Sequence, residues 1–312
     1  MNNPDLFLLE AARSQPLNDF LGTPVQYRMK VRTYSNCPPE ISVQRVDLTR
    51  DAEAYLRAWD KGFSNCGKRS GGARTAKPVE ERSEEDIQRS CFRSKSRLRA
   101  LVTELAPNHF TTFTTREDGS SPYFTPDDWK AIWAHFQRLV RQAGISFEYV
   151  GVLERHPSNP QHLHLHVAWR GRASYGLLRR FWHIAICGHR GVKVRKVLRG
   201  EDSPGNIQDR PIKAASGFKQ VRKIARYICK YITKDLIVEF NKRRYWPSKG
   251  INLQEAKVFW LESLSMSGAL REALILAGEW DFEAGKPAQQ IFNPSDRVAW
   301  CAVDPGRSPP PF

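Results

Sequence analysis

The segment that most constrains the fold is residues 162–169 (HLHLHVAW), in which histidine alternates with apolar residues. Successive side chains of a β-strand point to opposite faces, so this pattern predicts a strand with His162, His164 and His166 on one face. Imidazoles that project together from a strand are suitable ligands for a divalent metal ion. The alternative is a polar, exposed strand face on which histidines merely alternate.

A carboxylate precedes this strand. Residues 147–154 (FEYVGVLE) also read as a strand, and they end in Glu154. Residues 155–161 (RHPSNPQ) are expected to form a loop, across which the two strands could pair antiparallel. Such pairing can set Glu154 opposite His164, and a carboxylate there would complete a metal site.

A second motif, RYICKYITKDL, lies about sixty residues further along, in a helix predicted over residues 218–240. At about 100° per residue, Tyr227, Lys230, Tyr231 and Lys234 share an arc of about 100° beside an apolar stripe. Neighbouring lysines favour the phenolate of a tyrosine and can neutralise charge on a phosphate. The alternative is a solvated helix face with tyrosines at the rim of the core.

The remaining periodicity predicts an α+β fold, with an antiparallel central sheet that carries the histidines and with flanking helices that include the tyrosine helix. Thr125 and Pro126 give the clearest helix start, as N-cap and first helical residue. Further helices are expected over 84–105, 126–143, 175–186, 253–263 and 267–279, strands over 109–115 and 192–198, and a basic aromatic loop over 241–250.

The length of 312 residues allows about two domains. We expect an N-terminal extension over 1–92 with a flexible linker near 64–83, a catalytic domain over 93–250, and a helical region with a proline-rich tail over 251–312.

The charge balance points to a polyanionic partner, because 49 Lys and Arg against 33 Asp and Glu give a net charge of +16. No run of about 18 apolar residues predicts a membrane span, and the N-terminus does not resemble a secretory signal. The six cysteines form no CxxC pair. This argues against a zinc knuckle or a disulfide framework and fits a reducing cytoplasm.

The order of the motifs resembles that of the HUH endonucleases, and more narrowly the rolling-circle replication initiators of filamentous and related bacteriophages. The resemblance covers roughly residues 93–250 and rests on HFTTFTTRE, YVGVLE, HLHVAWRG, LLRRFW, YICKYITKD and KRRYW. It implies that His164, His166 and Glu154 hold a metal ion, with His162 as an alternative ligand. It also implies that Tyr227 and Tyr231 are the nucleophiles and that Lys230 and Lys234 accompany them.

The resemblance further implies Mg²⁺ or Mn²⁺ as cofactor and single-stranded origin DNA as substrate, cleaved through a 5′-phosphotyrosine in the cytoplasm of a bacterial host. The chain has no P-loop, so helicase and polymerase would come from the host. Basic segments with interleaved aromatic residues could hold phosphates and stack unpaired bases. The expected DNA-binding residues are Lys223, Arg226, Arg243, Arg244, Tyr245 and Trp246.

Three alternatives stay open. A two-histidine phosphoesterase uses two H-x-[ST] elements, which His109–Thr111 and His156–Ser158 match nominally. A basic DNA-binding repressor or packaging protein would carry out no chemistry. A plasmid relaxase or a single-strand transposase would use the same chemistry in another biological setting.

Overall fold

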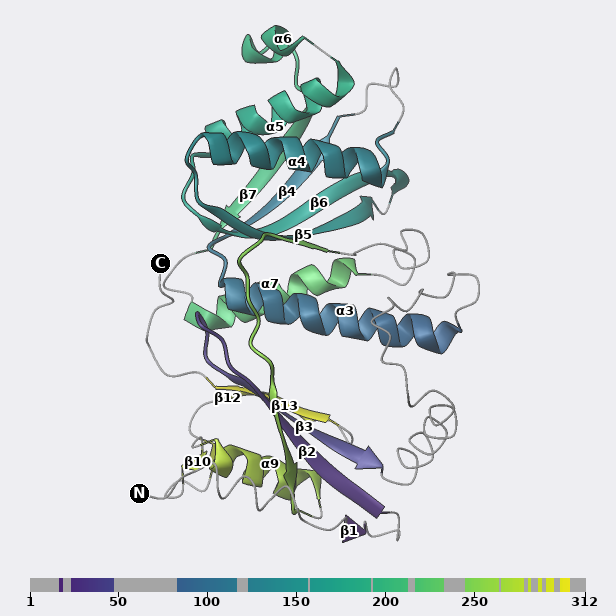
Figure 1. The fold of residues 1–312 in the computed structure, drawn as a ribbon, viewed down its shortest axis with the longest axis vertical. Helices are drawn as coiled ribbons and strands as arrows, with labels where there is room; N and C mark the ends of the chain where they lie inside the picture. Colours follow the sequence, from purple (N-terminus) through teal and green to yellow (C-terminus); the bar gives the residue numbers. More distant parts are fainter. Residues whose placement is uncertain are drawn as a thin grey trace, which may run out of the picture. The chain divides into compact units, whose positions relative to one another are not determined.

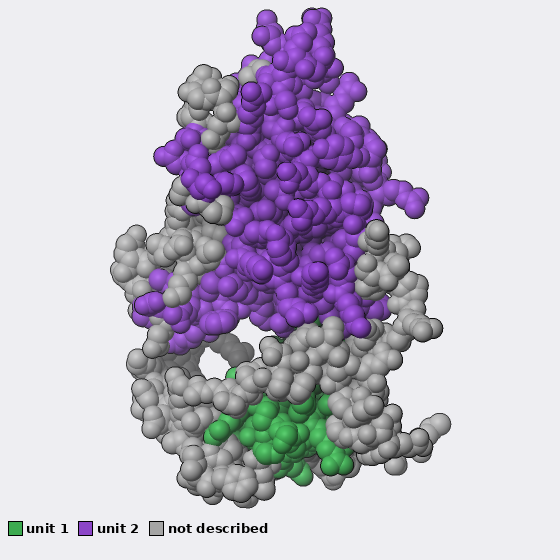
Figure 2. Space-filling view, turned by 180° about the vertical axis from the view of Figure 1, so that it is seen from behind, with its two compact units in different colours: residues 1–76, 254–308 green, residues 77–253, 309–312 purple. Residues whose placement is uncertain are grey.

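The chain divides into two compact units (Figure 2). Unit 1 comprises Met1–Ala76 and Gln254–Ser308, and unit 2 comprises Lys77–Leu253 with Pro309–Phe312. This division differs from the expected arrangement of three consecutive regions, because segments from both sides of unit 2 join in one sheet of unit 1. The computed structural model describes residues 17–18, 24–47, 83–116, 123–156, 158–191, 193–212, 217–232, 245–263, 265–277, 280–281, 286–287, 290–294 and 298–303. Most of the expected linker, residues 64–82, lies outside them.

Unit 2 is built on a five-stranded sheet in which every neighbouring pair is antiparallel. In spatial order its strands are β7 (Gly205–Pro211), β4 (His109–Thr115), β6 (Asn159–Gly171), β5 (Phe147–His156) and β8 (Trp246–Pro247).

Helices cover both faces of this sheet (Figure 1). Helices α4 (Pro126–Gln142) and α5 (Tyr175–Arg190) pack on one face, and α3 (Glu84–Leu105) and α7 (Gly217–Ile228) pack on the other. The predicted α+β class, with an antiparallel sheet flanked by helices, is therefore confirmed. No helix of the described residues is long and apolar enough to cross a membrane.

Helix α4 begins where its capping residues predict. Thr125 Oγ1 accepts a hydrogen bond from the Asp128 amide at 3.2 Å, and the Asp128 carboxylate accepts one from the Thr125 amide at 2.7 Å. This reciprocal capping box satisfies amides that the first helical turn leaves unpaired. Trp129 and Trp133 then lie buried against the sheet.

The alternation in β6 separates its two faces as predicted. Leu163, Leu165 and Val167 are buried with α4 and α5. The histidines face the opposite side, where Ala168 belongs to the cluster formed with α3 and α7. The site therefore lies on the α3–α7 side of the sheet.

Four local expectations were wrong. Residues 192–198 contain the short helix α6 (Val194–Leu198) rather than a strand, and 253–263 contain strand β9 (Lys257–Leu261) rather than a helix. The loop expected over 155–161 is shorter, because β5 continues to His156 and β6 begins at Asn159. The described part of 241–250 is not all loop, because Trp246 and Pro247 pair with β5.

The helix predicted over 218–240 also differs. Helix α7 ends at Ile228 and a 3₁₀ turn follows over Cys229–Tyr231. Ile232 is then extended and fully buried. Burial of this side chain in the α3–α7 cluster accounts for the early end of the α-helix.

Unit 1 is a second antiparallel sheet, in the order β1 (Leu17–Asn18), β2 (Pro24–Arg32), β3 (Glu40–Asp47), β13 (Val298–Val303) and β12 (Gln290–Pro294). Strand β9 also pairs with β2. Strands β10 (Trp280–Asp281) and β11 (Lys286–Pro287) form a separate hairpin. The apolar face of the main sheet packs on helix α9 (Met266–Leu276), which confirms the helix expected there.

Candidate active site

The strand register brings the predicted carboxylate to the histidines. Glu154 pairs with His164, as expected, and Val152 pairs with His166. The closest contact is diagonal, because His166 Nε2 lies 2.7 Å from Glu154 Oε2. His166 is buried, whereas Glu154 remains partly exposed. The pair therefore joins a fixed imidazole to a carboxylate that solvent can reach.

A threonine of β4 holds the other nitrogen of this ring. Thr112 pairs with His166 across the sheet, and its Oγ1 lies 3.1 Å from His166 Nδ1. A hydroxyl can donate or accept, so this contact serves either tautomer of the imidazole. Such contacts orient the ring of a metal-binding histidine.

His164 lies in a cluster of imidazoles at the end of the β5–β6 hairpin. Its ring centre is 4.7 Å from that of His162, 4.9 Å from that of His156 and 6.4 Å from that of His166. Burial, together with the neighbouring histidines, lowers the pKa of His164 to about 4. His164 is therefore neutral at pH 7, which is the form that binds metals.

His162 is engaged with the backbone. Its Nε2 lies 2.8 Å from the carbonyl oxygen of Thr115, which can only accept, so the imidazole donates from this nitrogen. This engagement makes His162 a less available ligand than His164 or His166.

The donor types fit the expected metal, since imidazole and carboxylate together suit divalent ions such as Mn²⁺. Within the part of the chain that the structure describes, no three His, Cys, Asp or Glu side chains are grouped closely enough to hold an ion. The Glu154–His166 hydrogen bond occupies two of the donor atoms. An ion bound here would have to replace the proton between them, with His164 turning toward it.

The tyrosines lie directly over the histidine strand. The ring of Tyr231 stacks on His166 with centres 3.8 Å apart and 3° between the planes. The ring of Tyr227 is 5.4 Å from that of Tyr231 at 89°, and it also touches Phe110 of β4, at 5.5 Å. Lys230 Nζ lies 5.5 Å from the centre of the Tyr227 ring. The fold thus brings the two sequence motifs together.

The two tyrosines differ in environment. Tyr227 is 40% exposed, whereas Tyr231 is half-buried. Burial raises the pKa of Tyr231 above its usual value, assisted by a hydrogen bond with Tyr227 and by the charges of Tyr227 and Glu154. Nearby Arg210 acts in the opposite direction. Tyr227 is therefore the more accessible hydroxyl and Tyr231 the harder one to ionise.

Arg210 was missed by the sequence reading. It lies on β7 opposite Phe110, on the same face of the sheet as the histidines. Strand β7 (GNIQDRP) has one large apolar residue and a proline at its end, so its sequence carries almost no strand signal. Only the pairing with β4 reveals that a cation joins the site.

The other expected DNA-binding residues have different positions. Lys223 and Arg226 are exposed on α7. Tyr245 packs against the α3–α7 cluster, whereas Trp246 is half-buried against the α4–α5 cluster, on the opposite face of the sheet. Lys234, Arg243 and Arg244 lie outside the described residues.

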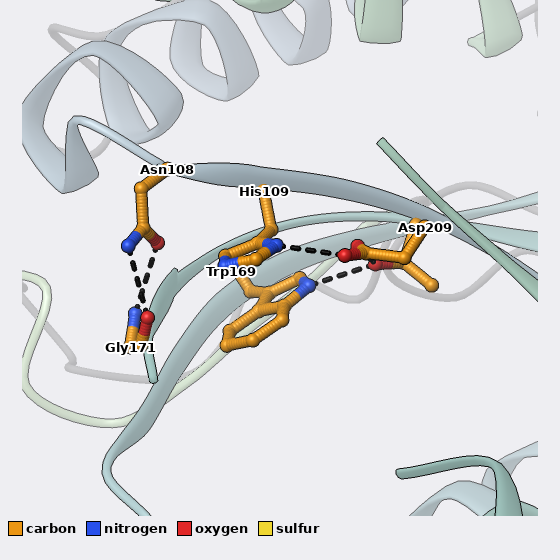
Figure 3. Close-up of polar contacts among 6 residues, drawn as sticks. Asn108, His109, Trp169, Gly171 and Asp209 are labelled. Carbon is orange, nitrogen blue, oxygen red and sulfur yellow. Dashed lines mark hydrogen bonds and ion pairs between the residues drawn. The ribbon is translucent and has the colours of Figure 1, made fainter. Parts of the chain in front are cut away.

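A polar network on the opposite face fixes β7 to β4 (Figure 3). His109 Nδ1 lies 2.8 Å from Asp209 Oδ2, and Thr111 Oγ1 donates to the other carboxylate oxygen. Trp169 Nε1 donates to Thr111 Oγ1 at 2.8 Å, and its ring stacks on His109. This network holds the strand that carries Arg210.

The same network bears on the phosphoesterase alternative. His109 and Thr111 face α4 and α5, whereas His156 contacts His162 and His164 on the other side of the sheet. The two H-x-[ST] elements therefore do not form a common site.

Comparison with known proteins gives one match. The family described as replication-associated protein ORF2 matches residues 108–236, which include β4, the histidine strand and both tyrosines. No curated protein and no solved structure matched the chain. Over this segment the chain is similar to replication-associated proteins, which is consistent with a rolling-circle replication initiator.

Proposed function

We propose that the chain is a metal-dependent, HUH-type DNA endonuclease and strand transferase that starts and ends rolling-circle replication of a phage. The observation that carries this proposal is the stacking of Tyr231 on His166 with Tyr227 beside it. Two phenols next to an imidazole–carboxylate pair have no evident role in packing alone. The similarity to replication-associated proteins supports the same reading.

In the proposed reaction a phenol oxygen attacks the phosphorus of a single-stranded DNA phosphate. A tyrosine–phosphate bond forms, the bond to the 3′ oxygen breaks, and that oxygen leaves as a hydroxyl after taking up a proton. The products are a 5′-phosphotyrosine and a free 3′ end. The second tyrosine can cleave the regenerated origin later, and the 3′ hydroxyl then displaces the first tyrosine to close a circle.

The residues around the phenols suit these steps. Lys230 lies beside Tyr227, and Arg210 favours the phenolate of Tyr231. His164, His166 and Glu154 would hold Mg²⁺ or Mn²⁺, which would polarise the phosphate. Exposed Lys223 and Arg226 on the same helix would hold neighbouring phosphates.

The proposed partners are single-stranded origin DNA and the replication enzymes of a bacterial host, with the protein acting in the host cytoplasm. A plasmid relaxase or a single-strand transposase would share the chemistry, and the tyrosine pair favours the initiator. A non-catalytic DNA-binding protein is the remaining alternative.

The test is incubation with single-stranded oligonucleotides from the candidate origin, with Mn²⁺ or with EDTA, followed by denaturing gel electrophoresis. We expect a metal-dependent protein–DNA adduct that is absent in Tyr227→Phe/Tyr231→Phe. Salt-sensitive binding without any adduct would favour the non-catalytic alternative. An adduct that persists in the double variant would refute the assignment of the nucleophiles.

A further inference from the structure

A second cationic surface lies on unit 1, on the sheet face opposite helix α9. Strand alternation puts Tyr27 and Met29 into the core with α9, so Arg28, Lys30 and Arg32 of β2 share the other face. We call this surface the basic face. It also contains Gln44 of β3 and Trp260 of β9, which both pair with Arg28.

The basic face is accessible at its centre. Lys30 and Gln44 are exposed, Val258 next to Lys30 is 49% exposed, and Arg28, Arg32 and Trp260 are partly exposed. At one end, Glu40 pairs with Arg32, is buried and accepts a hydrogen bond from Tyr34 at 2.8 Å.

An aromatic ring is fixed beside these cations. The Arg28 guanidinium lies 5.9 Å from the centre of the Trp260 ring and donates to Gln44 Oε1 at 2.8 Å. The arginine is therefore held between a ring and an amide. Guanidinium groups and indole rings are the side chains on which unpaired bases stack.

The cations repel one another. Burial and the charges of Arg32 and Arg28 together lower the pKa of Lys30. None of the ion pairs between described residues involves Arg28, Lys30 or Arg32. A bound polyanion would relieve this repulsion, which a neutral or cationic partner would increase.

We propose that the basic face of unit 1 binds single-stranded DNA, as a second DNA contact separate from the candidate active site. Three cations at every second residue of β2 are about 6.5 Å apart, comparable to one extended nucleotide, so each can contact a successive phosphate. Trp260 then stacks on a base. An open sheet face with an aromatic residue suits a single strand, whose bases are free to stack, better than a duplex. The proposal does not depend on cleavage by unit 2.

The test measures binding of the full chain to a fluorescent oligothymidylate, which lacks an origin, and to a duplex of the same length. Arg28→Gln/Lys30→Gln is compared with Lys257→Gln/Arg271→Gln, which removes two exposed cations of the same unit on the α9 side. Thermal unfolding confirms that both variants fold. For the oligothymidylate, loss of two phosphate contacts should make the slope of log K against log salt shallower by about 1.4. The control should change it little.

Trp260→Leu should weaken oligothymidylate binding about 5- to 150-fold, and Trp260→Phe should restore much of it. An oligonucleotide carrying 5-iododeoxyuridine should crosslink to Trp260. Equal losses in both double variants, no loss in Arg28→Gln/Lys30→Gln, or equal loss for duplex and single strand would overturn the proposal. Adduct formation by the same variants at saturating origin DNA tests the function of unit 2 independently.

Discussion

The ring of Tyr231 lies flat on the imidazole of His166, although 64 residues separate them in the sequence. This contact covers one face of the histidine and buries half of the phenol. It also leaves Tyr227, one turn earlier, at the surface beside Lys230. The two tyrosines of the motif are thus unequal before any DNA is bound.

This inequality predicts which tyrosine reacts first. Tyr227→Phe should slow the first cleavage about tenfold or more, because the exposed hydroxyl next to a cation is the one that is ready to attack. Tyr231→Phe should leave the first cleavage largely intact and impair the second. Single-turnover adduct formation, with peptide mapping of the phosphotyrosine, measures both. A larger effect of Tyr231→Phe on the first step would reverse the order.

The metal ligands can be tested without DNA. We expect His166→Ala and Glu154→Gln each to weaken Mn²⁺ binding strongly, because each removes a donor of the pair. His162→Ala should change it much less, since His162 is bonded to the Thr115 carbonyl. Calorimetric titration with Mn²⁺ gives the affinities. Strong loss in His162→Ala would shift the ligand pair to His162 and His164.

Arg210 should affect the ionisation of Tyr231. In a Tyr227→Phe background, Arg210→Gln should lower the cleavage rate about 10²-fold and move its alkaline pH dependence upward, because the cation that favours the phenolate is lost. Arg210→Lys should recover part of the rate. A lower rate with an unchanged pH profile would indicate that Arg210 acts only on the structure.

The stability of the metal-free protein should decrease below about pH 6.5, the ordinary pKa of histidine, and continue to decrease toward pH 4. The folded state holds the pKa of His164 at about 4, so the unfolded chain binds the proton more tightly over this interval. His164→Asn should make the decrease shallower. Urea unfolding at several pH values measures it, and identical slopes in both proteins would contradict the expectation.

The network on the opposite face should contribute to stability. Asp209→Ala leaves the partners Thr111 and His109 without their acceptor and should lower the free energy of unfolding by about 1–3 kcal/mol. Glu201→Gln is the control, because its ion pair with Arg199 is exposed and long, at 3.7 Å, and should be worth less than about 1 kcal/mol. Equal effects in urea unfolding would argue against this role of the network.

Strong local patterns explain which parts could be predicted from the sequence. The alternation in β6 and the capping residues of α4 each depend on neighbours a few residues apart, and both were right. The register of Glu154 with His164 followed because a short hairpin limits the choices. The contact of Tyr231 with His166 could be anticipated only through the family resemblance.

Tertiary pairing decided the rest. Strand β7 exists because β4 offers it an edge, not because its sequence favours a strand. The α7 helix ends early because Ile232 is needed in the core. Strands β2 and β3 alternate well but were overlooked in a segment read as an extension. Strand β9 was mistaken for a helix because a short apolar run such as KVFWL fits both periods.

The shared sheet of unit 1 also sets an order of folding during synthesis. Strands β2 and β3 leave the ribosome before any of unit 2, but β9 and β13, which pair with them, follow only after all of its strands. Unit 2 can therefore fold while the edges of β2 and β3 still lack their partners. Until β9 and β13 emerge, these edges are open to pairing with other chains, so the nascent protein is at greatest risk of aggregation during that interval.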